Sequence, residues 1–322
     1  MGTLSGPDHS GGAQTLMSTA LLAVQTLNGL QLGVLLFLIA AGLTLVFGVM
    51  DFINLAHGVQ YMLGAYFAVT AYNLTENFLL AVIVALAGAM LVGLLLEAVI
   101  FRHLYGRDHL DQVLATFGII LFLNEAVRMI YGSGSLALPM PEALSGTIRL
   151  MPGLLYPVYR LVIIGAGIGV AVLLYVLVTH TRIGMLVRAG ASNAPMVSAL
   201  GVDIGRLFTI IFAIGAMLAG FAGAMVAPIF AVEPNMGDNL LILAFVVIVI
   251  GGIGSVRGAF VAALLVGLVD TLGRSSASDI LRSVLSSSAA NQAGPALAST
   301  LIYVLMAAVL FFKPAGLFPA RG

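Results

Sequence analysis

Long apolar runs dominate the hydrophobic pattern of this chain, and its polar residues gather in short breaks between them. Residues 16–50 carry no charge, and similar runs recur toward the C-terminus. Because a helix needs roughly 20 apolar residues to cross a bilayer, the pattern predicts about nine membrane-spanning helices, with eight to ten compatible. Their expected positions are 22–50, 55–73, 78–101, 111–131, 158–179, 206–231, 240–254, 257–272 and 296–313.

The composition supports a membrane protein. Hydrophobic residues make up 61% of the 322 positions and charged residues only 8%, against roughly 25% charged residues in a soluble domain. The continuous runs exclude a membrane β-barrel, whose strands alternate in polarity. We therefore expect an all-α, polytopic transmembrane helix bundle, with residues 21–322 forming a single domain after a disordered N-terminal lead at residues 1–20.

The basic residues indicate an orientation, because cytoplasmic loops hold an excess of Lys and Arg. One set of connections contains eight such residues and the other set contains four, so the first set and the C-terminus are expected in the cytoplasm. The first set is Arg102, Arg107, Arg182, Arg188, Arg206, Arg257, Lys313 and Arg321, and the second is Arg149, Arg160, Arg274 and Arg282.

The sequence shows no pattern typical of an enzyme. Cysteine is absent, and the 13 basic residues balance the 13 acidic ones. None of the motifs H-E-x-x-H, G-x-S-x-G and GxxxxGK[ST] occurs, which are typical of zinc, serine-nucleophile and phosphate-loop sites. We expect no metal ion, no cofactor and no nucleic-acid partner, and ATP hydrolysis would require another protein.

One polar break stands out, the segment DFINLAHGVQYMLGAY at residues 51–66, which places Asp51, Asn54 and His57 between two apolar runs. A charged residue at a helix centre costs roughly 2.5–3.5 kcal/mol. Irregular backbone is tolerated at membrane depth only where protein or a water-filled cavity surrounds it. Two interpretations are open: a tight cytoplasmic turn in which Asp51 and Asn54 cap the next helix, or a helix break that lines a pathway. The polar residues favour the break.

A weaker second break, IGGIGSVRGAF at residues 250–260, interrupts a later apolar run at Gly252 and Gly254. Glycine-interrupted segments in the two halves of a chain point to the central site of a transporter. An ordinary glycine turn is the alternative. Small residues also recur every four positions, which predicts close helix packing; these are Gly215, Ala219, Gly223 and Ala227 in one strip and Gly254, Gly258 and Ala262 in another.

The longest cytoplasmic connection, residues 181–206, contains a predicted helix of its own. Asn193 suits a helix N-cap and Gly201 suits a helix end, so a short helix from Ala194 to Leu200 is expected along the membrane surface. Its apolar side needs a partner protein, or else the helix lies on lipid.

Three blocks of the sequence resemble a known family. GLTLVFGVMDFINLAHGVQYMLGAY, RAGASNAPMVSALGVDI and IVIGGIGSVRGAFVAALLVGLVD occur in this order and are similar to the membrane permease of branched-chain amino acid ABC importers. The resemblance is closest to the H-type permease, which pairs with a second, M-type permease, and it runs from about residue 20 to the C-terminus.

The resemblance implies a bacterial inner-membrane importer with a second (M-type) permease, two ATP-binding subunits and a periplasmic substrate-binding protein. Branched-chain or other hydrophobic amino acids would cross by alternating access, through a fold like that of the larger, cobalamin-type ABC importer permeases. Segment 181–206 would dock on the ATPase, and the breaks would lie near the pathway. The expected coupling residues are Arg188, Asn193, Ala194, Ala199, Leu200 and Gly201, and the expected pathway residues are Asn54, His57, Gly58, Gly252 and Gly254.

Other functions remain open from the residues alone. A passive channel for a small polar solute, such as urea or an amide, would explain a broken helix but not the docking segment. A secondary transporter usually needs buried ionisable groups, and the spans offer few. An intramembrane enzyme would need a nucleophile and a base, and no such pair is visible.

Overall fold

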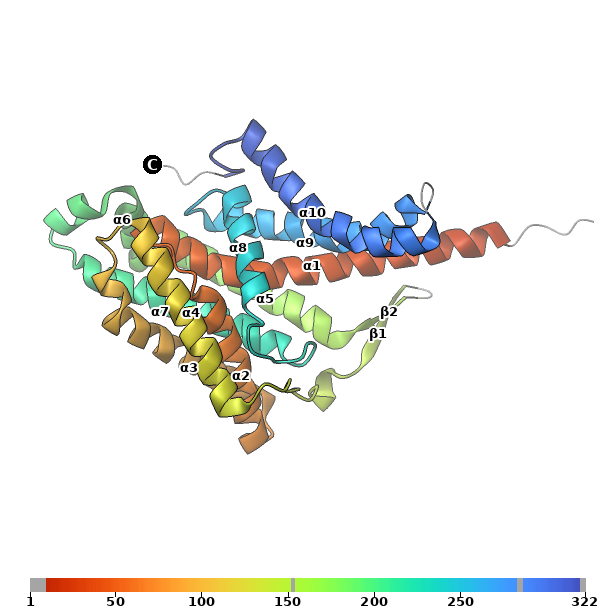
Figure 1. Ribbon diagram of the computed structural model, residues 1–322, viewed down its shortest axis with the longest axis horizontal. Coiled ribbons are helices and arrows are strands. Elements are labelled where there is room, and N and C mark those ends of the chain that lie inside the picture. Colours follow the sequence, from red (N-terminus) through yellow and green to blue (C-terminus); the bar gives the residue numbers. More distant parts are fainter. Residues whose placement is uncertain (1–9, 152–153, 283–285, 319–322) are drawn as a thin grey trace, which may run out of the picture.

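The computed structural model describes residues 10–151, 154–282 and 286–318, and these are mostly helical (Figure 1). The prediction of an all-α bundle is confirmed. The helices are α1 (Ser10–Met50), α2 (His57–Thr75), α3 (Phe78–Val99), α4 (His109–Tyr131), α5 (Val158–His180), α6 (Arg182–Ala199), α7 (Ile204–Val226), α8 (Asp238–Gly251), α9 (Val256–Leu281) and α10 (Ser287–Phe312). Two 3-10 turns, η1 (Phe101–His103) and η2 (Glu142–Leu144), and an antiparallel hairpin of β1 (Thr147–Met151) and β2 (Leu154–Pro157) complete the described part.

Each of the nine predicted spans coincides with a helix, but the helices differ in whether they can cross a bilayer. Six described helices are long and apolar enough, or up to seven if the bent α10 counts as one span. Two others, α2 and α8, are not among the six. α8 has 14 residues and is therefore about 21 Å long, shorter than the roughly 30 Å hydrocarbon core. The lead predicted as disordered also differs, because residues 10–20 belong to α1; residues 1–9 lie outside the described part.

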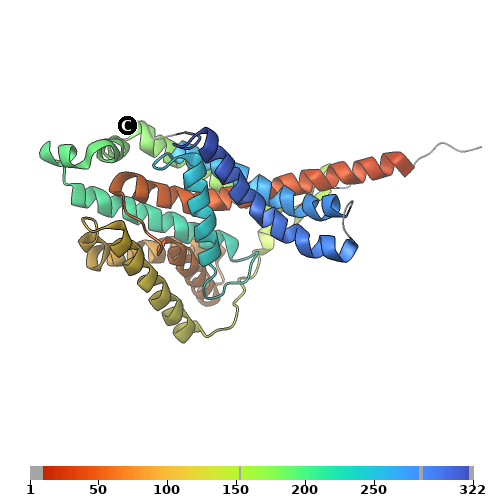
Figure 2. The ribbon, with the colours of Figure 1, turned by 45° about the horizontal axis from the view of Figure 1, so that its top comes forward.

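Two helices organise the bundle. α1 is the longest and contacts α5, α7, α8 and α9, while α7 contacts α1, α2 and α3. Figures 1 and 2 show α1 running along the long axis of the molecule with α8 crossing it. By contrast, α3, α4 and α5 turn large apolar side chains outward. α2 lies between α3 and α7, and most of its residues are buried, so it can carry polar side chains that a lipid-facing helix could not.

Small residues let the inner helices approach closely, as the four-residue strip predicts. A Cβ atom built on Gly223 would lie 2.0 Å from the Tyr61 carbonyl oxygen, and one built on Gly64 would lie 2.3 Å from the Gly220 Cα atom. Real side chains cannot occupy such positions, so glycine is required where α2 meets α7. The second strip behaves similarly, because a Cβ on Gly258 would lie 2.0 Å from the carbonyl oxygen of Gly251.

We predict that Gly64→Ala destabilises the protein, because α2 and α7 would have to separate to admit the methyl group. Overpacking typically costs about 1–3 kcal/mol, so thermal unfolding of the detergent-solubilised protein should begin roughly 5 °C lower. Gly118→Ala is the matched control, since nothing lies within 4 Å of a Cβ at that position of α4. Equal unfolding temperatures for the two variants would contradict the close packing.

Candidate functional site

The chain between α1 and α2 turns back into the bundle. Asp51 follows α1 in a left-handed backbone conformation (φ 49°), and its amide donates to the Phe47 carbonyl at 3.0 Å. α2 then begins at His57, whose Nε2 atom lies 3.1 Å from the carbonyl oxygen of Ile39. Ile39 precedes Met50, the last residue of α1, by 11 positions, or about 16 Å along a helix axis. The first turn of α2 therefore lies deep beside α1.

Contacts from the α3–α4 connection hold this break in place. The Phe52 ring is fully buried, with its centroid 5.3 Å from that of Phe101 and 5.6 Å from that of Tyr105. The backbone amide of Ile53 donates to Gln112 Oε1 at 3.1 Å. The predicted capping of α2 by Asp51 or Asn54 is wrong, because α2 makes no side-chain cap hydrogen bond at its N-cap, Ala56. The helix break is present, and its role in a pathway stays a prediction.

The break carries buried polar side chains whose hydrogen-bonding capacity is not used. Asn54 and His57 are both buried, and so is Gln60, one turn along α2. Both side-chain polar atoms of Asn54 and of Gln60 lack a hydrogen-bond partner among the described residues. A buried group in this condition costs about 1–3 kcal/mol. Gln60 was not predicted for the site, although its spacing of three residues from His57 places both on one helix face.

Gly58 brings the first turns of α2 and α8 together. A Cβ built on Gly237, the N-cap of α8, would lie 2.0 Å from the Gly58 carbonyl oxygen, and one on Gly58 would lie 2.8 Å from the Gly237 oxygen. Two helices thus begin side by side within the bundle. Since helix N-termini carry partial positive charge, the backbone there is suited to polar or anionic neighbours.

The second break has a clear backbone role. Gly252 and Gly254 both have positive φ angles, 99° and 78°, a conformation that glycine adopts without the steric penalty of a Cβ atom. A Cβ on Gly48, near the end of α1, would lie 2.2 Å from the Gly254 Cα atom. The two glycines thus form the turn between α8 and α9 and pack it against α1. Their predicted place on a pathway stays a prediction.

The C-terminal segment closes this second break. The amide of Leu317 donates to the Ile250 carbonyl at 2.8 Å, and that of Phe318 donates to the Gly251 carbonyl at 3.0 Å. The last carbonyls of a helix have no partner within the helix. The C-terminal segment therefore satisfies backbone groups that α8 leaves open.

The short helix predicted from Ala194 to Leu200 is present as the second half of α6, and its coupling role stays a prediction. The backbone of Asn193 is not helical (φ −160°, ψ 86°), and its Oδ1 accepts from the Met196 amide at 2.9 Å. Asn193 is therefore the N-cap that the sequence predicts. The helix ends at Ala199, and Gly201 follows with a φ of 89°, as expected of a glycine at a helix end. The preceding helix of α6, from Arg182, was not predicted.

One face of α6 is fixed to the bundle and the other is free. Val187, Gly190 and Val197 are buried, and a Cβ on Gly190 would be 3.3 Å from Val49 and Leu207 side chains of α1 and α7. By contrast, Leu200 is 76% exposed and Met196 62%.

The other predicted coupling residues occupy mixed positions. Ala199 and Gly201 are exposed and Ala194 is partly buried. Arg188 donates from its guanidinium group to the Val178 carbonyl at the end of α5, which gives it a structural role within this chain. The predicted coupling residues therefore lie together at one end of the bundle. The buried side chains of Asn54 and His57 lie at a separate place.

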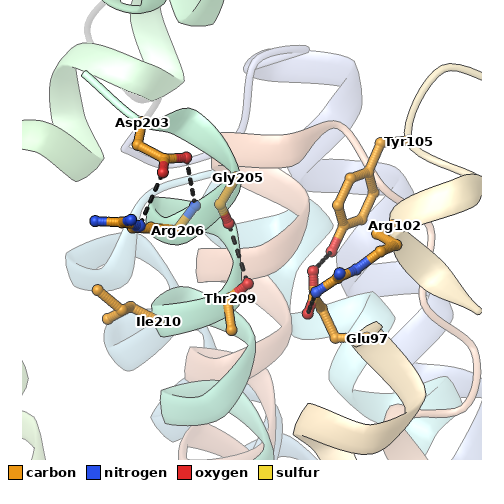
Figure 3. Close-up of a pocket in the computed structure, with 8 residues that line it drawn as sticks. All are labelled: Glu97, Arg102, Tyr105, Asp203, Gly205, Arg206, Thr209 and Ile210. Carbon is orange, nitrogen blue, oxygen red and sulfur yellow. Dashed lines mark hydrogen bonds and ion pairs between the residues drawn. The ribbon is translucent and has the colours of Figure 1, made fainter. Parts of the chain in front are cut away.

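A pocket of about 650 Å³ opens beside the α6–α7 connection (Figure 3). On one wall, the buried Glu97 carboxylate accepts from Arg102 at 3.2 Å and from the Tyr105 hydroxyl at 3.1 Å. Burial and the adjacent Glu97 carboxylate raise the pKa of Tyr105, which stays a neutral donor. On the other wall, Asp203 pairs with Arg206 at 2.9 Å. The sequence did not indicate this pocket, since its walls come from separate segments.

Comparison with known proteins identifies relatives along most of the chain. The sequence model of a family described as branched-chain amino acid transport system / permease component matches residues 25–310. The high-affinity branched-chain amino acid transport system permease protein BraD of Pseudomonas aeruginosa is 30% identical over 313 residues, covering 91% of this chain and 94% of BraD. The corresponding permease LivH of Escherichia coli is 30% identical over 283 residues, covering 81% and 89%.

A more distant relative, the ribose import permease protein RbsC of Escherichia coli, is 25% identical over 248 residues and covers 72% of each chain. No solved structure matches this chain. The expected likeness to the cobalamin-type permeases therefore stays a prediction.

We predict that Asn193→Ala loosens the second half of α6, because the Met196 amide loses its acceptor. Loss of a helix N-cap costs roughly 0.5–2 kcal/mol, so amide hydrogen exchange from Met196 to Ala199 should accelerate several-fold. Asn193→Asp keeps a cap oxygen and serves as the control. Exchange at the wild-type rate in Asn193→Ala would contradict the assignment of this cap.

Proposed function

Because this chain belongs to the family of branched-chain amino acid transport system permease components, we propose that it is the membrane subunit of an ATP-driven importer. In this proposal it translocates branched-chain or other hydrophobic amino acids by alternating access in the bacterial inner membrane. Its partners are a second, M-type permease, two ATP-binding subunits and a periplasmic substrate-binding protein. The C-terminus and α6 face the cytoplasm.

The observation that carries the proposal is the two-sided character of α6. Its buried face is attached to α1 and α7, whereas Met196 and Leu200 project from its second half. An exposed apolar helix end that is rigidly joined to the bundle fits a groove in a partner protein, as in helix-in-groove recognition. A channel that works alone would have no use for such a helix.

The contacts of α6 offer a physical connection to the interior. Gly190 adjoins Val49, one residue before the end of α1, and the chain then enters the break that carries Asn54 and His57. On its other side Gly190 adjoins Leu207 in the first turn of α7, and α7 packs along α2. A displacement of α6 would thus act on the segment that carries Asn54 and His57 from both sides, through the end of α1 and through α7. Alternating access requires coupling of this kind.

The substrate class is supported by the relatives. BraD and LivH are named for high-affinity transport of branched-chain amino acids, and RbsC is named for ribose import. The higher identity and coverage of the first two favour an amino acid. The rival function, a passive channel for urea or an amide, is an outcome of the test that follows.

We predict that this chain, tagged and extracted from native membranes in detergent, co-purifies with ATP-binding subunits and a second permease. Leu200→Arg should abolish recovery of the ATP-binding subunits at an unchanged level of the chain itself, because a charge would replace an exposed apolar contact. Leu74→Arg is the matched control, since Leu74 is an equally exposed leucine at the end of α2. Recovery of this chain alone, or only as copies of itself, would instead support a channel.

We further predict that Asn54→Leu reduces amino acid uptake without destabilising the protein. Replacing an unsatisfied buried amide by an apolar side chain of similar size is neutral or stabilising for the fold. A pathway role would nevertheless be lost with the amide. Uptake should fall at least several-fold while the thermal unfolding temperature and recovery of the ATP-binding subunits stay unchanged. If the variant fails to accumulate in the membrane, Asn54 is a structural residue.

A further inference from the structure

Basic side chains from three helices gather at the C-terminal end of α5. Arg257, in the first turn of α9, donates from Nη2 to the Tyr175 hydroxyl of α5 at 3.1 Å. Its guanidinium carbon also lies 4.8 Å from the centroid of the Tyr175 ring, and the His180 ring centroid lies 6.1 Å from the same ring. Arg188 of α6 donates to the Val178 carbonyl. Tyr175 and Val178 are neighbours on the surface of α5, so the two arginines and the histidine form one basic cluster.

Contacts within the protein position both guanidinium groups without neutralising them. Tyr175 attracts Arg257 through the negative face of its ring and through one hydrogen bond. The Val178 carbonyl belongs to the last turn of α5, whose carbonyls have no partner within the helix, and Arg188 supplies one. An arginine has five N–H donors, and each of these two uses one of them in a hydrogen bond to a described residue. Most of the donors stay available to an outside ligand.

No carboxylate of the described residues neutralises the basic cluster. Residues 143–202 contain no Asp or Glu, and neither do residues 239–269; together these ranges include α5, α6 and the turn from α8 into α9. Within the described ranges, no ion pair involves Arg188, Arg257 or His180. All three side chains are exposed. The positive charge of the cluster is therefore open to an anion from outside this chain.

The apolar outer face of α5 leads directly to the basic cluster. α5 is among the six helices that are long and apolar enough to cross a membrane, so its ends lie at the level of the lipid headgroups. Val172, Leu173 and Val176 are exposed, and each lies within one helical turn of Tyr175. A phospholipid has the same order of parts, with apolar chains followed by a charged phosphate. The outer face of α5 thus matches a lipid molecule in both chemistry and order.

We propose that Arg257, Arg188 and His180 bind the phosphate of an anionic phospholipid whose acyl chains lie along α5. A guanidinium group matches the oxygens of a phosphate in charge and in geometry, and basic residues just beyond a membrane span attract anionic lipids. A lipid also provides the apolar partner that the outer face of α5 requires, which a free phosphate does not. The inference goes beyond the proposed importer function and does not depend on it.

The first test follows thermal unfolding of the full chain, purified in a neutral detergent and titrated with dioctanoyl phosphatidylglycerol. The lipid should raise the unfolding temperature of the wild type by several degrees, since a ligand stabilises the folded state that it binds. Arg257→Gln should need about tenfold more lipid for the same shift, because a charge-assisted contact is lost. Arg257→Lys keeps the charge and should restore part of the affinity. Dioctanoyl phosphatidylcholine, which has no net charge, should leave the unfolding temperature unchanged.

Arg149→Gln is the matched control for this titration. Arg149 is an exposed arginine of β1, in the hairpin that leads into the first residue of α5. Because α5 has 23 residues and is about 34 Å long, this variant should respond to the lipid as the wild type does. Equal titrations of the wild type and Arg257→Gln would overturn the proposal. So would an equal shift from glycerophosphoglycerol, which has the phosphate and no acyl chains, because the ligand would then be a soluble phosphate ester.

A second measurement identifies the occupant in native membranes. Photoreactive benzoylphenylalanine replaces Val176, and irradiation should join it to a phospholipid, which mass spectrometry detects as added mass on the purified chain. Anionic lipids should be enriched among these adducts relative to their abundance in the membrane, and Arg257→Gln should remove the enrichment. Adducts without such enrichment, or with a second permease or another copy of this chain, would overturn the proposal. Failure of the importer function would leave these outcomes unchanged, since none of them measures transport.

Discussion

The bilayer leaves no water for an interrupted helix, so every backbone group freed by a break must find a partner in protein. This constraint explains much of the structure. At the first break, Gln112 accepts from the Ile53 amide and an aromatic cluster encloses Phe52. At the second, the C-terminal segment donates to the last carbonyls of α8. Elements distant in sequence are thus required where α1 and α8 end.

Close packing makes the buried polar groups tolerable. Glycines bring α7 within backbone contact of α1 and α2, and α3 covers another side. His57 and Gln60 consequently face protein and not lipid, although neither Asn54 nor Gln60 has its hydrogen bonds completed among the described residues. Buried polar groups without hydrogen bonds destabilise the fold. They are expected where a protein changes its hydrogen-bond partners during function. The same two helices, α1 and α7, anchor α6 at one end, which joins the proposed coupling surface to the interior.

The sequence predicted both ends of the short helix within residues 181–206 well, and the reasons are local. Asn193 and Gly201 act as helix cap and helix end, because both roles depend on a few neighbouring backbone atoms. Asp51 and Asn54 failed as predicted caps for α2, since the chain re-enters the bundle before α2 begins. Gln60 was not predicted. Its spacing from His57 places both residues on one face of α2, but the sequence does not show which helices bury that face.

The sequence by itself determined the class of protein, because continuous hydrophobic runs of membrane length form helices in lipid. It also determined where nine helices lie, although α1 begins earlier than predicted, at Ser10, α9 continues to Leu281 and α10 begins at Ser287. Three ordered blocks also identified the family. Only the tertiary structure decided that α2 starts beside Ile39 of α1, and that α2 and α8 begin together at Gly58 and Gly237. Hydrophobicity specifies burial in the membrane but not which neighbour buries a residue, and that choice follows from packing across the whole bundle.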